Sequence, residues 1–257
     1  MIRTTILVLG GVLLAARLEA QTKQTPTLTE VGYWDTTYIR VGLETHTGNV
    51  QSTNFTADAD WNRSVGLLES RFDFDSSWWK AHGTKILEKQ RADWELRRLL
   101  RPHSRWFVLL DSLAEHHETN GINLRTAIGP GIGVHAVDTH KTRFTMEAGA
   151  QWTHERHNSG FTDSYAAAFF YEGLQMRLTD HLLLDHETKF RWNLENTKQM
   201  HIFSETDLDY RITRAVFFST GIIINYAAVP VKDHKRTDVE TRTVLKIRFG
   251  RHGVMDM

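Results

Sequence analysis

The chain of 257 residues contains no cysteine, so no disulfide bond can hold its fold together. Proline is scarce, with four residues, and 31 Lys and Arg are balanced by 31 Asp and Glu. A formal net charge of zero gives no overall basic field that would attract nucleic acid. After Gln21 no apolar run approaches the roughly 20 residues that a membrane-spanning helix needs. If the chain lies in a membrane, it does not cross it as helices.

The first 20 residues have the three parts of a secretory signal peptide. Arg3 gives a positive start, ILVLGGVLLAA is an uninterrupted apolar stretch, and Ala20 is a small residue at the cleavage position. An uncleaved anchor is the alternative, because Leu18 is not the small residue usual two positions before cleavage. We expect residues 1–20 to be removed on export, and residues 21–37 to form an N-terminal periplasmic segment.

Apolar and polar residues alternate along most of the mature chain. The pattern is clear in the stretches NFTADADWN, RFDFDSSW, ETKFRWNL and TVLKIRF. Successive side chains of a strand point to opposite faces, so each stretch has one apolar face and one polar, mostly charged, face. A helix would spread the charges around its circumference. The alternation therefore predicts β-strands.

Twelve strands are predicted, with ten as the alternative, and most have ten residues or more. Globular strands favour about five or six residues, whereas a tilted strand needs about 9–11 to cross a bilayer. The predicted strands cover residues 38–46, 51–62, 66–78, 85–97, 104–116, 122–136, 142–156, 163–177, 181–194, 201–213, 215–228 and 238–249. An even number of long antiparallel strands after an export signal is typical of an outer-membrane barrel. We predict an all-β transmembrane barrel over residues 38–249 and a short C-terminal extension over residues 250–257.

The side on which the apolar face lies distinguishes this prediction from a soluble barrel or β-sandwich. Soluble barrels also alternate, but they turn the apolar face inward. Here the polar face carries paired opposite charges. Six tryptophans near strand ends could form the aromatic girdles of a membrane barrel. The alternative is that they are ordinary core tryptophans. These residues are Trp61, Trp78, Trp94, Trp106, Trp152 and Trp192. We expect the apolar face to contact lipid and the polar face to line the lumen.

The segment AIGPGIGVHAV carries three glycines at alternate positions, as a phosphate-binding loop might. Such a loop needs a helix after it, but another alternating strand follows here. Glycine inside a strand marks a bend, a bulge or a close approach, and Pro130 cannot donate to the ladder, so we expect a break or bulge there. Gly129, Gly131 and Gly133 then make room for Trp106, Trp152 or lumen side chains.

Several short motifs spread along the chain resemble those of one known family. They are Gly48-Asn49 with Ser52 and Asn54, the glycine segment Ala127–Val134, Glu147-Ala148-Gly149, and Pro230 with Thr237-Asp238 and a last strand ending at Phe249. Over residues 38–249 the chain resembles the uncharacterised salt-induced outer-membrane proteins of domain-of-unknown-function family 481. The resemblance implies a barrel in the outer membrane and transfers no catalytic residue. One departure is that GRHGVMDM follows Phe249, so the terminal aromatic that the barrel-assembly machinery reads would be internal.

With both chain ends in the periplasm, connections after even-numbered strands are periplasmic and short, and those after odd-numbered strands are external and longer. The polar face then becomes the lumen. The candidate lumen charges are Asp58, Asp60, Asp73, Asp75, Arg91, Asp93, Glu187, Lys189, Arg191, Asp207, Asp209 and Arg211. They could line a pore that selects ions or small solutes, or form a salt-bridge network that fills the barrel. Twelve strands fall between filled eight-stranded and open 16–18-stranded barrels, so both interpretations stay open.

Fourteen histidines show no metal-ligand spacing such as HExxH, so we expect surface histidines, no metal site and no cofactor. A serine hydrolase acting on lipid would need Ser112 with His116, or Ser159 with His157, yet neither serine lies in a G-x-S-x-G setting. We therefore expect that the protein is not an enzyme.

The hypothesis is a monomeric outer-membrane barrel, either a narrow channel or a structural envelope component, with a link to salt or osmotic stress from the family resemblance alone. Its expected partners are outer-membrane lipids, the barrel-assembly machinery during insertion, and ions or small solutes, but no nucleic acid. The alternatives are an outer-membrane enzyme acting on lipid and a soluble periplasmic barrel that binds a small hydrophobic ligand.

Overall fold

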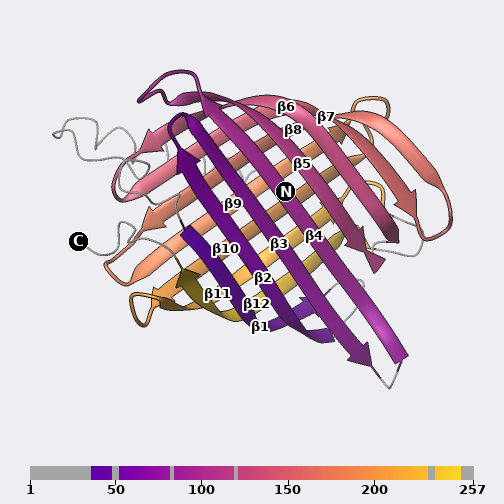
Figure 1. Ribbon diagram of the computed structural model, residues 1–257. Helices are drawn as coiled ribbons and strands as arrows, with labels where there is room; N and C mark the ends of the chain where they lie inside the picture. Colours follow the sequence, from indigo (N-terminus) through magenta and orange to yellow (C-terminus); the bar gives the residue numbers. More distant parts are fainter. Residues whose placement is uncertain (1–35, 48–51, 82–83, 119–120, 231–234, 250–257) are drawn as a thin grey trace, which may run out of the picture.

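A computed structural model describes residues 36–47, 52–81, 84–118, 121–230 and 235–249. The expected signal peptide and C-terminal extension lie outside these ranges, as do all but the last two residues of the expected periplasmic segment. Within them the chain forms twelve strands, which follow one another as a closed antiparallel barrel (Figure 1). The predicted barrel and its strand number are confirmed.

The strands extend beyond the prediction at half of their ends. Their bounds are β1 Thr36–Thr47, β2 Ser52–Val65, β3 Leu68–Ala81, β4 Thr84–Leu99, β5 Trp106–His117, β6 Ile122–Asp138, β7 Thr142–His157, β8 Thr162–Arg177, β9 Leu182–Asn193, β10 Met200–Arg211, β11 Val216–Ala227 and β12 Thr237–Phe249. Each strand pairs with the next along the chain. The barrel closes where β12 pairs with β1, from Thr37 opposite Phe249 to Thr47 opposite Val239.

An even strand number places the start of β1 and the end of β12 at the same rim of the barrel. The connections after even-numbered strands share this rim, here called the turn rim, and those after odd-numbered strands lie at the opposite loop rim. Connection length separates the rims less sharply than expected. Residues 228–236 form a long connection at the loop rim, but residues 100–105 at the turn rim are as many as residues 194–199 at the loop rim.

The two faces of the wall differ in polarity as the alternation predicts. On β1, Ile39, Val41 and Leu43 are exposed, whereas Arg40 and Glu44, at the alternate positions, are buried inside the barrel. The same reversal runs through β2, β3 and β12. A soluble barrel would bury the apolar set, so an apolar exterior around a charged interior is the arrangement of a membrane-spanning barrel. Within the described residues, no helix is long and apolar enough to cross a membrane.

Four of the six tryptophans are exposed on the outer face. Trp61, Trp94 and Trp106 lie towards the turn rim, and Trp152 lies towards the loop rim. Trp192, near the loop-rim end of β9, stacks its ring on Phe190 with a centroid separation of 5.6 Å. The side chain of the sixth, Trp78, is outside the described part.

The glycine strand β6 turns its glycines inward. A Cβ at Gly131 would lie 2.9 Å from the ring of Phe169 and 3.2 Å from Leu109, and one at Gly133 would meet the ring of Phe107. These side chains form a small apolar cluster with Leu99 on the inner wall. Gly131 and Gly133 therefore make room for lumen side chains, and not for Trp106 or Trp152, whereas Gly129 allows the close approach of the β7 backbone at Ala150.

The strand is interrupted at its proline without being bulged. The register of β6 on β7 is the same on both sides of Pro130, although neither Gly129 nor Pro130 is paired there. The register shifts of this ladder fall instead between Ile122 and Leu124 and between His135 and Val137. The structure thus shows a break in pairing, and the expected bulge at Pro130 is absent.

Candidate functional site: the barrel lumen

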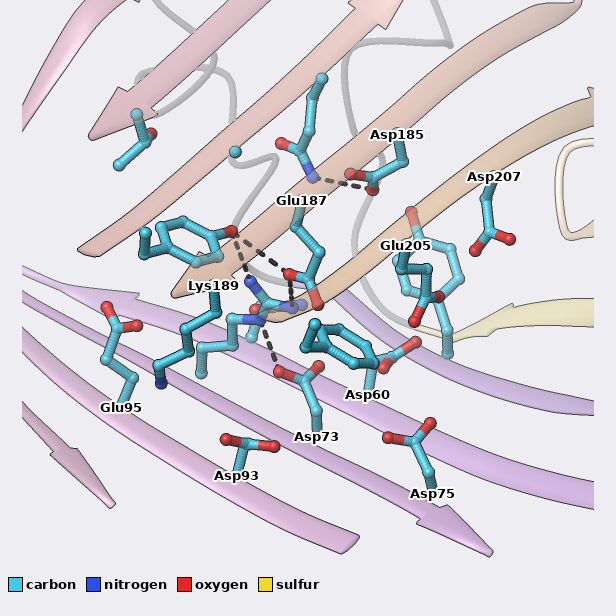
Figure 2. Close-up of a pocket in the computed structure, with 18 of the residues that line it drawn as sticks. Asp60, Asp73, Asp75, Asp93, Glu95, Asp185, Glu187, Lys189, Glu205 and Asp207 are labelled. Carbon is cyan, nitrogen blue, oxygen red and sulfur yellow. Dashed lines mark hydrogen bonds and ion pairs between the residues drawn. The ribbon is translucent and has the colours of Figure 1, made fainter. Parts of the chain in front are cut away.

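Within the described part of the barrel, the lumen includes two cavities whose walls come from most of the strands. The central cavity has a volume of about 130 Å³, and the acidic residues around it face one another across the barrel (Figure 2). Its charged lining consists of Arg40, Arg71, Arg91, Arg97, Arg143, Lys189 and Lys246, and of Asp60, Asp73, Asp75, Asp93, Glu95, Asp111, Asp185, Glu187, Glu205 and Asp207. Ten carboxylates against seven cations give this cavity an excess of acidic groups.

The loop-rim cavity has a volume of about 140 Å³ and includes residues of three loop-rim connections, such as Phe161, Gln199 and Pro230. Its charged lining consists of Arg91, Arg125, Lys189, Arg191, Lys235 and Arg236, and of Glu115, Glu155, Asp163 and Asp238. Six cations against four carboxylates reverse the balance of the central cavity. A solute that entered from the loop rim would therefore meet a basic region before an acidic one.

Arg91, Lys189 and Phe203 line both cavities and so mark the boundary between them. The guanidinium of Arg91, from β4, lies over the ring of Phe203, from β10, at 4.2 Å from its centroid. This is a cation–π distance, and β4 and β10 are not neighbours in the wall. The contact therefore reaches across the lumen and narrows it between the two cavities.

Further ion pairs also cross the lumen. Arg71 on β3 donates to Glu187 on β9 at 3.0 Å, and Lys189 on β9 donates to Asp111 on β5 at 2.7 Å. Arg97 on β4 donates to Glu147 on β7 at 2.6 Å. Each pair joins strands that do not neighbour each other in the barrel. Side chains consequently divide the lumen, and the open space inside the barrel is far narrower than the space that the backbone wall encloses.

A dense cluster of charges surrounds Arg40 and Arg242 on one wall of the barrel. Arg40 lies 2.8 Å from Asp60, 3.6 Å from Asp75, 3.7 Å from Glu205, and 3.8 Å from both Asp58 and Asp207. Arg242 donates to Asp207 at 2.7 Å and to Glu205. Buried charges are tolerated only when they are paired and hydrogen-bonded, and two arginines here hold five carboxylates. The cluster is therefore sensitive to the loss of either arginine.

Nine of the twelve predicted lumen charges line one of the two cavities. They are Asp60, Asp73, Asp75, Arg91, Asp93, Glu187, Lys189, Arg191 and Asp207. Asp58 lies behind the central cavity, where it accepts a hydrogen bond from Thr56 at 2.9 Å, and Asp209 accepts one from Lys246 at 2.9 Å. Arg211 is half-buried at the turn-rim end of β10.

Sequence reasoning missed several lumen residues that hold the network together. Arg40 could have been found, since it stands between the apolar Ile39 and Val41, and Arg242 precedes Lys246 by four positions on the same face. The partners on β5 to β7 were harder to find. In this part of the wall apolar side chains such as Phe107 share the lumen face with Asp111, and the alternation is blurred.

Of the two serines considered for catalysis, Ser112 has another hydrogen-bond partner. The Ser112 hydroxyl donates to the backbone carbonyl of Trp94 at 3.0 Å, and Nδ1 of His116 lies 2.7 Å from the carbonyl oxygen of Asn123. Both side chains belong to the outward-facing set of β5. Nε2 of His157 lies 3.5 Å from Glu155. Among the described residues, no three His, Asp or Glu are arranged to hold a metal ion.

A closed barrel with an apolar exterior and a charged, partitioned interior defines the chain as a porin-like β-barrel. It belongs to the family described as protein of unknown function, DUF481, whose sequence profile matches residues 39–249. A comparison with curated proteins found no match.

The solved structures that match this chain include porins and an outer-membrane channel. The NanC porin in a rhombohedral crystal form has a TM-score of 0.54 at 11% identity, covering 81% of this chain and 98% of that one. The KdgM porin, in complex with disordered oligogalacturonate, has a TM-score of 0.46 at 7% identity, covering 82% and 99%. The outer-membrane channel DcaP of Acinetobacter baumannii has a TM-score of 0.44 at 7% identity, covering 83% and 96%. At such identities a likeness concerns the fold alone, and here the NanC porin carries it.

Proposed function

We propose that this protein is an outer-membrane channel of narrow bore that passes ions or small solutes. The observation that carries the proposal is the pair of lumen cavities that share Arg91, Lys189 and Phe203 as a common boundary. Two cavities in succession along a charged lumen provide a path whose narrowest part consists of side chains, which can move without opening the wall. Rings of charge along such a path select ions by sign.

The rival interpretation within the same fold is a barrel that only supports the envelope, with a lumen filled by salt bridges. The cross-lumen pairs favour it, and the two cavities favour the channel. Cavities lined largely by charged and polar groups hold water, which gives ions a medium to cross. We therefore favour the channel, and a filled barrel that conducts no ions would refute it.

Planar-bilayer recording of the purified, folded barrel tests the proposal. We expect small discrete conductance steps from the natural protein and larger steps from Phe203→Ala, because the ring fills part of the boundary between the cavities. Trp152→Ala is the matched control, since its aromatic side chain faces outward and is 56% exposed. The channel proposal fails if neither the natural protein nor Phe203→Ala gives discrete steps.

The proposal assigns no catalysis to this chain. It is supported by the hydrogen bonds of Ser112 and His116 to backbone carbonyls on the outward side of β5. Lipid turnover by the purified barrel that disappears in Ser112→Ala or Ser159→Ala would contradict this part.

The remaining parts of the proposal concern the surroundings of the barrel. Outer-membrane lipids contact the apolar exterior, and the barrel-assembly machinery inserts the chain. A role under salt or osmotic stress is also proposed, and only the family resemblance supports it. Survival of a deletion strain at high salt that equals its parent would contradict the stress role while leaving the channel untouched.

A further inference from the structure

We propose that the loop-rim cavity binds the acid group of a small organic anion, with the guanidinium of Arg191 as its principal anchor. The inference rests on the proposed channel function and names the solute class that enters it. Two nitrogen atoms of this guanidinium lack a hydrogen-bond partner within the described part of the chain.

Arg191 extends from β9 into the lumen, opposite His201 on β10 and Phe169 on β8. Its side chain is only 13% exposed, and its buried Nε and Nη2 atoms have no hydrogen-bond partner among the described residues. Among the described residues, the nearest carboxylate is that of Asp93, at 3.9 Å from Nη2. This distance lies beyond the range of a charge-assisted hydrogen bond. A buried guanidinium in this state needs an acceptor from outside the protein, because its desolvation is otherwise uncompensated.

The neighbouring acidic groups are already held by other side chains. Asp93 accepts a short hydrogen bond from Arg91. Glu115 and Glu155 both accept from Arg125, at 2.9 and 2.6 Å, and Tyr165 also donates to Glu155 at 2.6 Å. Arg191 is thus surrounded by carboxylates committed elsewhere, in a cavity with more cations than acids.

The remaining lining indicates what kind of anion fits. Besides charged groups, the cavity presents the apolar or aromatic side chains of Ile122, Phe161, Phe203, Tyr226 and Val229. Its volume of about 140 Å³ is far above the roughly 10–15 Å³ that one water needs. Arg presents a planar fork that matches a carboxylate or a phosphate bidentately. A short carboxylic acid with an apolar tail therefore uses both the guanidinium and the apolar wall, whereas a bare inorganic anion uses only the first.

Isothermal titration calorimetry of the folded barrel in detergent tests the site, with propionate and inorganic phosphate as probes. We expect propionate to bind more tightly than phosphate or chloride, and Arg191→Gln to weaken its binding about tenfold or more, as the loss of a charge-assisted pair implies. Arg191→Lys keeps the charge but loses the fork, so its affinity falls between the two. Heat-modifiable gel migration verifies that each variant is folded.

Arg248→Gln is the matched control. Arg248 is on the lumen face of β12 near the turn rim, donates to the carbonyl of Arg214 at 2.6 Å, and lines neither cavity. The proposal is overturned if Arg191→Gln binds propionate like the natural protein, if Arg248→Gln loses as much affinity, or if propionate binds no better than chloride. Because calorimetry does not depend on conduction, Arg191-dependent binding by a barrel that gives no conductance steps would refute the channel and leave the site in place.

Discussion

Replacement of Arg40 by methionine tests the idea that the lumen charges act as one connected network. Methionine keeps an unbranched side chain as long as the aliphatic stem of arginine and removes the guanidinium with its charge. The Arg40 side chain is 8% exposed and lies within 3.8 Å of five carboxylates, whose negative charge it compensates. Asp60, at 2.8 Å, loses its hydrogen-bond donor, and Asp75 loses its nearest cation, whereas Asp207 keeps Arg242.

Removal of one partner from a buried ion pair costs about 3–5 kcal/mol, because the other charge is left buried and unpaired. We expect Arg40→Met to lower the free energy of unfolding by this amount, which is more than a hundredfold in the unfolding equilibrium since each 1.4 kcal/mol is a factor of ten. Arg40→Met combined with Asp60→Asn should cost less than the sum of the single changes, because the second change removes one of the stranded charges.

The assay is urea unfolding of the barrel in lipid vesicles, followed by the fraction that keeps the folded migration on unheated gels. Arg63→Met is the control, since Arg63 is exposed and its loss should leave the transition unchanged. An Arg40→Met barrel that unfolds at the same urea concentration as the natural protein would refute the connected network. So would strict additivity of Arg40→Met and Asp60→Asn.

Two further predictions concern the wall. Gly129→Ala should destabilise the barrel by about 1–3 kcal/mol, because the added Cβ would meet the carbonyl oxygen of Ala150 in the backbone of β7. Gly131→Ala should destabilise it less, because a Cβ at Gly131 lies 2.9 Å or more from its neighbours. Equal urea midpoints for the two variants would contradict this order. Ile132→Arg, on the outer face where the isoleucine is 58% exposed, should cost about 2–4 kcal/mol in vesicles if it lies near the bilayer centre, while Ile132→Leu costs little. Tolerance of the arginine would argue against lipid contact there.

The strands were predictable because alternation in a membrane barrel is enforced on both faces. Lipid on one side and charge on the other leave few ambiguous positions in β2 and β3, where Phe72 and Phe74 interleave with Asp73 and Asp75. The wall from β5 to β8 is different, because Phe107 and Phe169 lie on the lumen face and the inner set is no longer polar throughout. In this part of the wall the glycines of β6 indicated a close approach of neighbouring groups, but the residues that approach them from the adjacent strands could not be identified from the sequence.

The candidate site was predictable as a set of inward charges and not as a set of contacts. Period-two alternation places Arg71 and Glu187 in the lumen, yet nothing local indicates that they meet at 3.0 Å. Such a pairing depends on strand tilt, stagger and rotamer around the whole circumference. Arg191 was identified as a lumen charge for the same reason. That its Nε and Nη2 atoms lack a hydrogen-bond partner among the described residues is visible only once its neighbours have been placed.

The cross-lumen pairs also bear on how the chain reaches its final state. The hydrogen-bonded partners Arg97 and Glu147 are 50 residues apart in sequence, Arg71 and Glu187 are 116 apart, and Lys89 and Glu240 are 151 apart. Contacts between such distant segments form late, because long loops must close first. Until β12 meets β1, an open sheet would present these charges to lipid, where each is costly. The pairing of β12 with β1 and the neutralisation of the interior charges should therefore occur as one cooperative step. Such a step favours insertion by an assembly machinery that keeps the open sheet away from lipid until β12 has been added.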